Sequence, residues 1–335
     1  MDATTVAVDL AKSVFQLAAA DSNWRIIEKH RRTRTKFQRF FANRNVRLVV
    51  MEACGGAHYW ARQIQALGIE VRLLPPRYIR AYVKPNKADA ADAAALLEAA
   101  RCADIAPVKI KSVEQQALQC LHRTREQWMR TRTARINCLH GQCREFGFSI
   151  AQGPRVGLEQ IARLIADPHT AVPQILLATM RSLLDESRLL EVRIHDLEKQ
   201  LGALARQSSP CTTLLSIPGV GLLTSTALVA ATSGEVRHFK DARHFAAWFG
   251  LTPKEHSSGN TRRLGRISKR GDAYVRMLLT HGARSVIAAA AAKAKPVRHW
   301  IGCDSGRSNW RNAVTATKPL CTGQQDGQAL LRHVA

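Results

Sequence analysis

Acidic residues that follow apolar runs constrain the fold of this chain more than any other feature. Asp9 and Glu52 each close a hydrophobic run typical of a buried strand, and Asp89 and Asp92 lie three residues apart at the start of an alanine-rich helical stretch. A carboxylate at a buried strand end is costly to desolvate unless a positive charge meets it. Mg²⁺ prefers hard oxygen ligands, and paired ions for phosphoryl displacement lie about 3.5–4 Å apart. The pattern therefore predicts a divalent-metal site where two strand ends meet one helix face.

The net charge of the chain indicates a polyanionic partner. The sequence has 50 Lys and Arg against 26 Asp and Glu, which gives a formal charge of +24. Nucleic acid is the partner that such a charge favours, although a basic solvated surface would give the same composition. A carboxylate cluster in so cationic a chain favours metal-dependent chemistry on nucleic acid.

Length, hydropathy and cysteine spacing limit the number of domains and argue against a membrane protein and a zinc protein. The 335 residues suggest two or three domains. No apolar stretch is long enough for a transmembrane helix and the N-terminus lacks a signal-peptide pattern, so we expect no membrane partner and a cytoplasmic location. The eight cysteines contain no CxxC pair, which argues against structural zinc and fits reduced thiols.

The first third of the chain has the pattern of a mixed α/β sheet. Three apolar or alternating segments come first, and helical and strand patterns then alternate, which favours an α/β fold. Strands are expected at residues 4–10, 13–20, 24–30, 46–52 and 70–75, and helices at residues 35–43, 57–68 and 88–103.

Two long helical segments follow, and both have a distinctive surface. Residues 113–146 combine an apolar stripe with many arginines, whose excess favours phosphate contact over a merely solvated face. The candidate arginines are Arg123, Arg125, Arg130, Arg132 and Arg135. Residues 174–205 carry a heptad-like seam that would pair either within the chain or between subunits. Its positions are Leu176, Met180, Leu183, Ser187, Leu190, Ile194, Leu197, Leu201 and Leu204.

A glycine-rich turn precedes the expected helix at residues 222–232. The run from Ile217 to Gly221 resembles a helix-hairpin-helix, in which Gly219 and Gly221 would expose backbone N–H groups to a phosphate. An ordinary helix connection would have a similar sequence, so both interpretations stay open.

A basic serine segment follows at residues 253–272. Three glycines divide it into turns, and between Arg237 and Arg284 there are eleven Lys or Arg residues against three acidic ones. A serine next to a glycine among these cations offers a hydroxyl nucleophile beside groups that stabilise a pentacoordinate phosphate. A Ser-Gly turn in a nucleic-acid-binding loop is the alternative, and composition alone favours it. The candidate contacts are His256, Arg262, Arg263, Arg266, Lys269 and Arg270.

These acidic and serine motifs, taken together over residues 4–295, resemble the insertion-sequence transposases of the 110 family, in particular its 1111 subgroup. The motifs that carry the resemblance are Val8–Lys12, Met51–Gly55, Asn86–Ala93, Gly250–Pro253, His256–Gly259 and Arg263–Asp272. The resemblance implies a RuvC-like, ribonuclease-H-type sheet in which Asp9, Glu52, Asp89 and Asp92 hold Mg²⁺, with Mn²⁺ as a substitute.

The resemblance also implies a reaction and partners. Ser258 would attack DNA and form a phosphoserine link in a site composed of both domains, with Ser257 as the near alternative nucleophile. From its place two residues before Ser258, and apart from the resemblance, we expect His256 to contact phosphate or support the loop. Donor DNA, target DNA and a structured non-coding bridge RNA would be the partners of a dimer or tetramer.

Four regions follow from the pattern and the resemblance. They are a RuvC-like domain at residues 1–108, a helical and coiled-coil region at 109–208, a mainly α transposase domain at 209–295 and a divergent, disordered tail at 296–335. A RuvC-like junction nuclease and a non-catalytic nucleic-acid-binding protein remain as alternatives. The serine motif argues against the first, because hydrolysis needs no protein nucleophile. The four carboxylates argue against the second, because they would repel its ligand.

Overall fold

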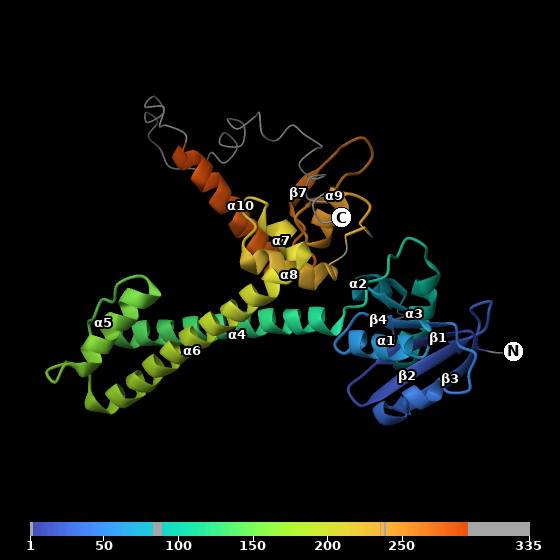
Figure 1. Ribbon diagram of the computed structural model, residues 1–335, viewed down its shortest axis with the longest axis horizontal. Coiled ribbons are helices and arrows are strands. Elements are labelled where there is room, and N and C mark those ends of the chain that lie inside the picture. The colour runs from blue at the N-terminus through green and yellow to red at the C-terminus, as the bar shows by residue number, and fades with distance from the viewer. Residues whose placement is uncertain (1–2, 83–88, 235, 238, 294–335) are drawn as a thin grey trace. The chain divides into compact units, whose positions relative to one another are not determined.

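The computed structural model of the chain describes residues 3–82, 89–234, 236–237 and 239–293 (Figure 1). Its contacts divide the chain into two units, Met1–Val113 and Glu114–Ala335. The tail expected at residues 296–335 lies outside the described residues. Among the helices that the structure describes, none is both long and apolar enough to cross a membrane.

The first unit is built on a five-stranded mixed sheet, as the sequence predicts. Its strands are β1 (Thr5–Leu10), β2 (Val14–Ala20), β3 (Ile26–Thr33), β4 (Leu48–Glu52) and β5 (Glu70–Leu74). Their order across the sheet is β3-β2-β1-β4-β5. β2 is antiparallel to β1 and β3, and β4 is parallel to β1 and β5. The parallel strands β1 and β4 therefore end at the same edge of the sheet.

Both faces of this sheet are covered, which explains the continuous apolar runs in β1 and β4. On one face Val8 and Met51 pack in a cluster that includes residues of α1 (Ala57–Gln65). On the other face Ala7 and Val50 pack in a cluster with residues of α3 (Asp89–Arg101). The short elements α2 (Pro76–Ile79) and η3 (Arg80–Tyr82) follow β5.

The expectation of one helix over residues 35–43 is wrong. The chain instead makes two 3₁₀ turns, η1 (Arg34–Lys36) and η2 (Gln38–Phe40). Phe37 is fully buried and packs edge-to-face against Phe15 and Trp60, with ring centroids 4.9 and 5.1 Å apart. Burying Phe37, Phe40 and Phe41 in one aromatic cluster decides the local backbone, which helical propensity alone does not describe.

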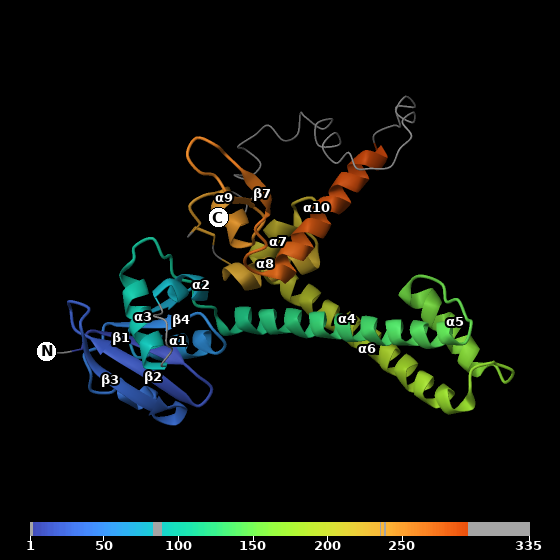
Figure 2. The ribbon, with the colours of Figure 1, turned by 180° about the vertical axis from the view of Figure 1, so that it is seen from behind.

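The second unit begins with a long helical hairpin made of α4 (Val113–Glu145), α5 (Pro154–Ala166) and α6 (Gln174–Arg206). α6 crosses α4 at an angle in both views (Figures 1 and 2), and both helices contribute to two shared hydrophobic clusters. Three arginines of α4 pair with glutamates of α6: Arg125 with Glu198, Arg132 with Glu191 and Arg135 with Glu186. Along α4 from the first of these arginines to the last, the sequence position of the paired glutamate in α6 decreases, so the two helices are antiparallel. The seam of α6 is thus covered within the chain.

Burial along α6 follows most of the seam positions expected from the sequence. Six of the expected seam residues are buried, namely Met180, Ser187, Leu190, Ile194, Leu197 and Leu201. At the other three steps the buried residue is the next one along the chain, namely Leu177, Leu184 and Ala205. The buried stripe therefore shifts by one residue towards both ends of the helix. The Ser187 hydroxyl, which is fully buried, donates to the Leu183 carbonyl oxygen at 2.8 Å.

The rest of the second unit is mainly helical. It comprises α7 (Ser209–Leu215), α8 (Leu222–Thr232), α9 (Ala242–Trp248), β6 (Pro253–Glu255), β7 (Leu264–Ile267) and α10 (Ala273–Lys293). α8 is buried along most of its length and packs against α6, α7 and α10. The strands β6 and β7 pair as an antiparallel hairpin. Neither this hairpin nor α5, α7 and α10 is expected from the sequence pattern.

Candidate active site

Asp9 and Glu52 lie at neighbouring strand ends on one face of the sheet. The parallel register of β1 and β4 pairs Val8 with Met51, so Asp9 and Glu52 are the next residues of the two strands. Side chains alternate between faces along a strand. Ala7 and Val50 belong to the cluster under α3. Asp9 and Glu52, two residues further on, are therefore on the same face as α3, and both are partly buried.

α3 brings a third carboxylate to this face. Burial raises the pKa of Glu52, the negative charge of Asp92 raises it further, and Arg80 lowers it. Asp92 on the first turn of α3 is thus close enough for Glu52 to be affected by its charge. Asp89 is the first residue of α3, and its side chain lies outside the described part of the structure.

Cys54 adds a thiol to the same strand end. Burial raises its pKa first, and the charges of Glu52 and Asp9 raise it further. In the sequence, Cys54 stands out only as part of the motif Met51–Gly55. Its position two residues after Glu52 is the signal that would have placed its thiol near the carboxylates.

The carboxylate cluster fits a divalent cation by its charge. Glu52 is half-buried next to a second carboxylate, and its pKa is raised first by burial and then by the negative charge of Asp92. A bound cation would compensate the negative charge of both carboxylates. Among the residues whose side chains are described, no three His, Cys, Asp or Glu residues lie close enough to hold an ion. Asp89 is not among those side chains, so the metal site remains a prediction.

Ser258 lies at the tip of the β6–β7 hairpin in the second unit. Ser258 and Thr261 exchange both backbone hydrogen bonds, at 3.3 and 3.1 Å, around a two-residue turn. Gly259 enters this turn with a φ of +52°, which glycine adopts without a side-chain penalty. Ser258 is exposed. Within the described residues its hydroxyl has no hydrogen-bond partner, so it is open to solvent.

The neighbouring Ser257 is held in a small polar network. Its hydroxyl donates to Glu255 Oε1 at 2.8 Å and accepts from the Arg263 backbone N–H at 3.1 Å. Arg262 Nε lies 3.6 Å from the same Glu255 oxygen. Ser257 therefore bridges the two arms of the hairpin.

His256 also serves the hairpin. Its backbone N–H donates to the Arg263 carbonyl oxygen at 2.8 Å. A Cβ on Gly265 of the facing strand would lie 3.5 Å from Cδ2 of His256, so the imidazole ring covers that glycine. This contact favours loop support for His256. The predicted cations of the hairpin are all exposed, namely Arg262, Arg263, Arg266, Lys269 and Arg270.

The base of the hairpin is fixed by two glycines with positive φ. A Cβ on Gly250 would lie 2.1 Å from the Arg270 carbonyl oxygen, and one on Gly271 would lie 2.0 Å from the Trp248 carbonyl oxygen. Arg276 closes the same junction, because its guanidinium donates to the carbonyl oxygens of Phe249 and Arg270, both at 2.9 Å. The end of α9, the end of β7 and the start of α10 are therefore held together.

The predicted phosphate contacts of α4 divide into two groups. Arg125 and Arg132 are only 13% and 18% exposed and form ion pairs with α6, and Arg135 pairs with Glu186. These three arginines stabilise the helical hairpin, a role that the sequence analysis does not assign to them. Arg123 is exposed, and Arg130 is 73% exposed with only its own helix neighbour Glu126 as a partner. Phosphate contact remains a prediction, and it is best suited to Arg123 and Arg130.

Gly219 and Gly221 have different environments in the turn between α7 and α8. Gly219 has a φ of +84°, and a Cβ there would lie 2.8 Å from the Gly282 carbonyl oxygen of α10. Nothing lies within 4 Å of the corresponding position at Gly221, which caps the N-terminus of α8. Gly219 is therefore required for close helix packing, while the open N-terminus at Gly221 keeps phosphate binding as a prediction.

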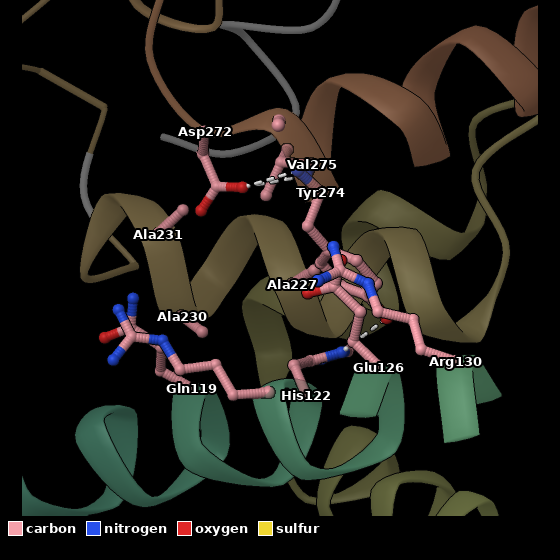
Figure 3. Close-up of a pocket in the computed structure, with 12 residues that line it drawn as sticks. Gln119, His122, Glu126, Arg130, Ala227, Ala230, Ala231, Asp272, Tyr274 and Val275 are labelled. Carbon is pink, nitrogen blue, oxygen red and sulfur yellow. Dashed lines mark hydrogen bonds and ion pairs between the residues drawn. The ribbon is translucent and has the colours of Figure 1, made fainter. Parts of the chain in front are cut away.

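A pocket of about 230 Å³ beside the N-terminus of α10 contains a histidine that the sequence analysis misses (Figure 3). His122 of α4 is buried, with Nε2 3.0 Å from Thr226 Oγ1 and Nδ1 3.2 Å from Tyr274 Oη. Burial lowers its pKa to about 4, so the ring is neutral. Asp272 caps α10 through the backbone N–H groups of Tyr274 and Val275. His122 thus connects α4 and α8 to the helix that follows the serine hairpin.

The protein combines a sheet that carries two carboxylates at neighbouring strand ends with a basic, exposed serine hairpin in its second unit. Comparison with known sequences identifies the family. The family model for the DEDD transposases of IS110 elements matches residues 6–146 of this chain, and its description is simply that of a transposase. A second model, described as the transposase IS116/IS110/IS902 family, matches residues 211–297.

Individual proteins of known sequence are similar to this chain over most of its length. A probable family 20 transposase of Pseudomonas aeruginosa is 40% identical over 90% of this chain and 89% of its own. The transposase for insertion sequence element IS1111A of Coxiella burnetii is 36% identical, over 94% of this chain and 86% of its own length. The transposase for insertion sequence element IS1328 of Yersinia enterocolitica is 33% identical, over 84% of this chain and 83% of its own length. The chain belongs to the IS110/IS116/IS902 family of insertion-sequence transposases.

Proposed function

We propose that this transposase cuts and rejoins DNA through a covalent phosphoserine link at Ser258, with Mg²⁺ held by Asp9, Glu52, Asp89 and Asp92. The observation that carries the serine assignment is the contrast between two adjacent hydroxyls. The Ser257 hydroxyl is engaged by Glu255 and the Arg263 N–H, whereas the Ser258 hydroxyl is exposed at the tip of a turn. A nucleophilic oxygen must be free to reach the phosphorus atom, and of these two hydroxyls only that of Ser258 is free and exposed.

The proposed step is a phosphoryl transfer. The Ser258 oxygen attacks phosphorus, the bond from phosphorus to one DNA oxygen breaks, and the proton of the serine ends on the released DNA hydroxyl. A DNA hydroxyl of the joining strand then attacks the phosphoserine and releases Ser258. The exposed cations Arg262, Arg263 and Arg266 would neutralise the charge that develops on the phosphate oxygens. Bound Mg²⁺ would lower the hydroxyl pKa and add to that neutralisation.

The proposal includes partners. Donor and target DNA are the substrates, a structured non-coding RNA guides their choice, and the protein acts as a homo-oligomer in the bacterial cytoplasm. What supports a nucleic-acid partner is the net charge of +24 together with the exposed cations of the hairpin. The RNA and the oligomer are carried over from the family resemblance.

A label-transfer experiment tests the serine reaction. The protein is incubated with end-labelled donor DNA, its guide RNA and Mg²⁺, and the products are separated on a denaturing gel. We expect labelled protein with wild type, none with Ser258→Ala, and a reduced amount with the matched Ser257→Ala variant. Nicked DNA without labelled protein would identify a metal-dependent nuclease instead, and unchanged label in Ser258→Ala would reject the assignment.

A further inference from the structure

The segment from β3 to β4 in the first unit is strongly basic and has no role in the proposed reaction. Between Arg25 and Arg47 there are nine Lys or Arg residues and a single acidic residue, Glu28. β3 is an edge strand, and none of its residues is buried. The charge is therefore concentrated on one accessible part of the unit.

Some of these cations surround a pocket of about 360 Å³. The pocket is lined by Arg32, Lys36, Arg39, Phe40, Ala42 and Arg44. No acidic residue lines it. Its interior is large enough for a phosphate group, and its lining offers several positively charged hydrogen-bond donors to one.

Two of the pocket arginines are held in place before any ligand arrives. Arg44 donates to Glu28 Oε2 at 2.9 Å, and its guanidinium lies 4.4 Å from the centre of the Phe40 ring. The guanidinium of Arg32 lies 5.6 Å from the same ring. Phe40 itself is 6% exposed. The fixed ring positions both guanidinium groups, which reduces the entropy that phosphate binding would cost.

Lys36 and Arg39 line the pocket and are exposed. Among the described residues, neither of them has an acidic partner. Glu28 engages Arg44 and His30, at 2.9 and 2.6 Å. The pocket thus retains positive charge that no described residue neutralises.

The pocket is on the opposite face of the sheet from the carboxylates. The register of β2 and β3 pairs Phe15 with Arg32 and Ala19 with Glu28. Phe15 and Ala19 belong to the cluster on the α1 face, so Arg32 and Glu28 are on that face as well. Asp9 and Glu52 are on the α3 face. A phosphate in this pocket is therefore separated by the sheet from any ligand of Asp9 and Glu52.

We propose that this pocket binds backbone phosphates of a nucleic-acid duplex and holds the substrate or guide away from the reacting bond. The inference rests on the proposed function, since it presumes a nucleic-acid partner. Unpaired bases bind proteins by stacking on exposed aromatic rings. The only ring in the pocket lining is Phe40, which is buried. The pocket therefore recognises the phosphodiester backbone rather than bases, and its binding is independent of sequence.

A basic edge strand has a second explanation, because charged edges prevent strand-to-strand aggregation. The two explanations differ in their dependence on position. Phosphate binding needs the charges that line the pocket, whereas protection of the edge needs only charge. Lys36→Ala with Arg39→Ala removes two exposed pocket charges that make no described ion pair. Arg25→Ala with Arg47→Ala removes two exposed charges of the same segment that do not line the pocket.

The test is equilibrium binding of the full chain to a short duplex, measured in EDTA over a salt series so that no covalent link forms. Each phosphate contact contributes about 0.9 to the slope of log affinity against log salt. We expect the pocket variant to lower that slope by about 1 to 2 and the control variant to leave it unchanged. Equal slopes for both variants, or an unchanged slope for the pocket variant, would overturn the proposal.

Duplex DNA and duplex RNA of the same sequence form the two arms of this test. A slope change with DNA alone assigns the pocket to the substrate, a change with RNA alone assigns it to the guide, and a change with both assigns it to the shared backbone. Label transfer to Ser258 in Mg²⁺ is measured separately. A failure of the covalent mechanism therefore leaves the binding result interpretable.

Discussion

Gly219 and Gly282 touch through their backbones, and each makes room for the other. A Cβ on Gly282 would lie 2.0 Å from the Gly219 carbonyl oxygen, and a Cβ on Gly219 would lie 2.8 Å from the Gly282 carbonyl oxygen. The turn before α8 therefore packs directly on α10, the helix that follows the serine hairpin. This contact gives the glycine-rich turn a structural role in addition to the phosphate contact that its sequence predicts.

Replacing either glycine of this contact should destabilise the second unit. In Gly282→Ala the gain in helix propensity is about 1 kcal/mol, but the added methyl group clashes with backbone that cannot move aside. We expect a net loss of about 1–3 kcal/mol in the free energy of unfolding, measured by denaturant titration. Gly221→Ala is the control and should cost only about 0.5–1 kcal/mol, since its site is open and the variant loses only the N-cap preference for glycine over alanine. Equal effects at the two positions would contradict the packing role.

Glu52→Gln should stabilise the metal-free protein at neutral pH while it abolishes strand exchange. The pKa of Glu52 is raised in the folded state, so ionised Glu52 costs stability as pH rises from about 4.5 through the folded-state pKa. Glutamine removes that cost, and the advantage should disappear below about pH 4.5. Melting in EDTA should show a rise of about 1–3 °C at pH 7. A lower melting temperature for the variant at pH 7 would mean that the carboxylate is compensated without metal.

His122 should make stability fall in mild acid. Burial lowers its pKa from 6.5 to about 4, so the unfolded state takes up a proton that the folded state does not. The stabilisation is complete above about pH 6.5 and is lost as pH falls towards 4, in total on the order of 3 kcal/mol. His122→Gln should flatten the pH dependence of unfolding over this range. His58 has a similarly lowered pKa in the first unit, so its contribution remains and serves as the internal control.

Arg125→Ala and Arg130→Ala should separate stability from nucleic-acid binding. Arg125 is 13% exposed and pairs with Glu198 at 2.6 Å, so its loss leaves a partly buried carboxylate without its partner and should cost about 1–3 kcal/mol. Arg130 is 73% exposed, and its loss should cost little stability but lower the salt slope of binding by about 0.9. Denaturation and salt titration of both variants check this difference. A lower salt slope in Arg125→Ala with unchanged stability would reverse the assignment.

The sequence predicts the sheet and most of α6 because their buried residues are contiguous or periodic. Asp9 and Glu52 follow apolar runs, so the parallel pairing of those runs brings them to one edge. Phe37 shows where this reasoning fails, since three-dimensional packing of aromatic rings replaces the expected helix with 3₁₀ turns. The hairpin at Ser258 is likewise missed, because its strands are exposed and carry no apolar alternation.

The functional candidates differ in the same way. Ser258 is found from its place next to Gly259 and from the family resemblance, but the engagement of Ser257 depends on a contact with Glu255 across the turn. The arginines of α4 appear alike in sequence, and only the antiparallel pairing with α6 separates Arg125 from Arg130. His122 gives no signal in the sequence, because its partners Thr226 and Tyr274 are more than a hundred residues away.

The identity of the nucleophile is the central claim, and peptide mapping of the covalent adduct tests it most directly. The protein would be incubated with DNA, guide RNA and Mg²⁺, denatured and digested with a protease and a nuclease, and the modified peptide sequenced by tandem mass spectrometry. We predict a nucleotide joined through its phosphate to the Ser258 oxygen. The same modification on Ser257, or its persistence in Ser258→Ala, would contradict the assignment of Ser258 as the attacking residue.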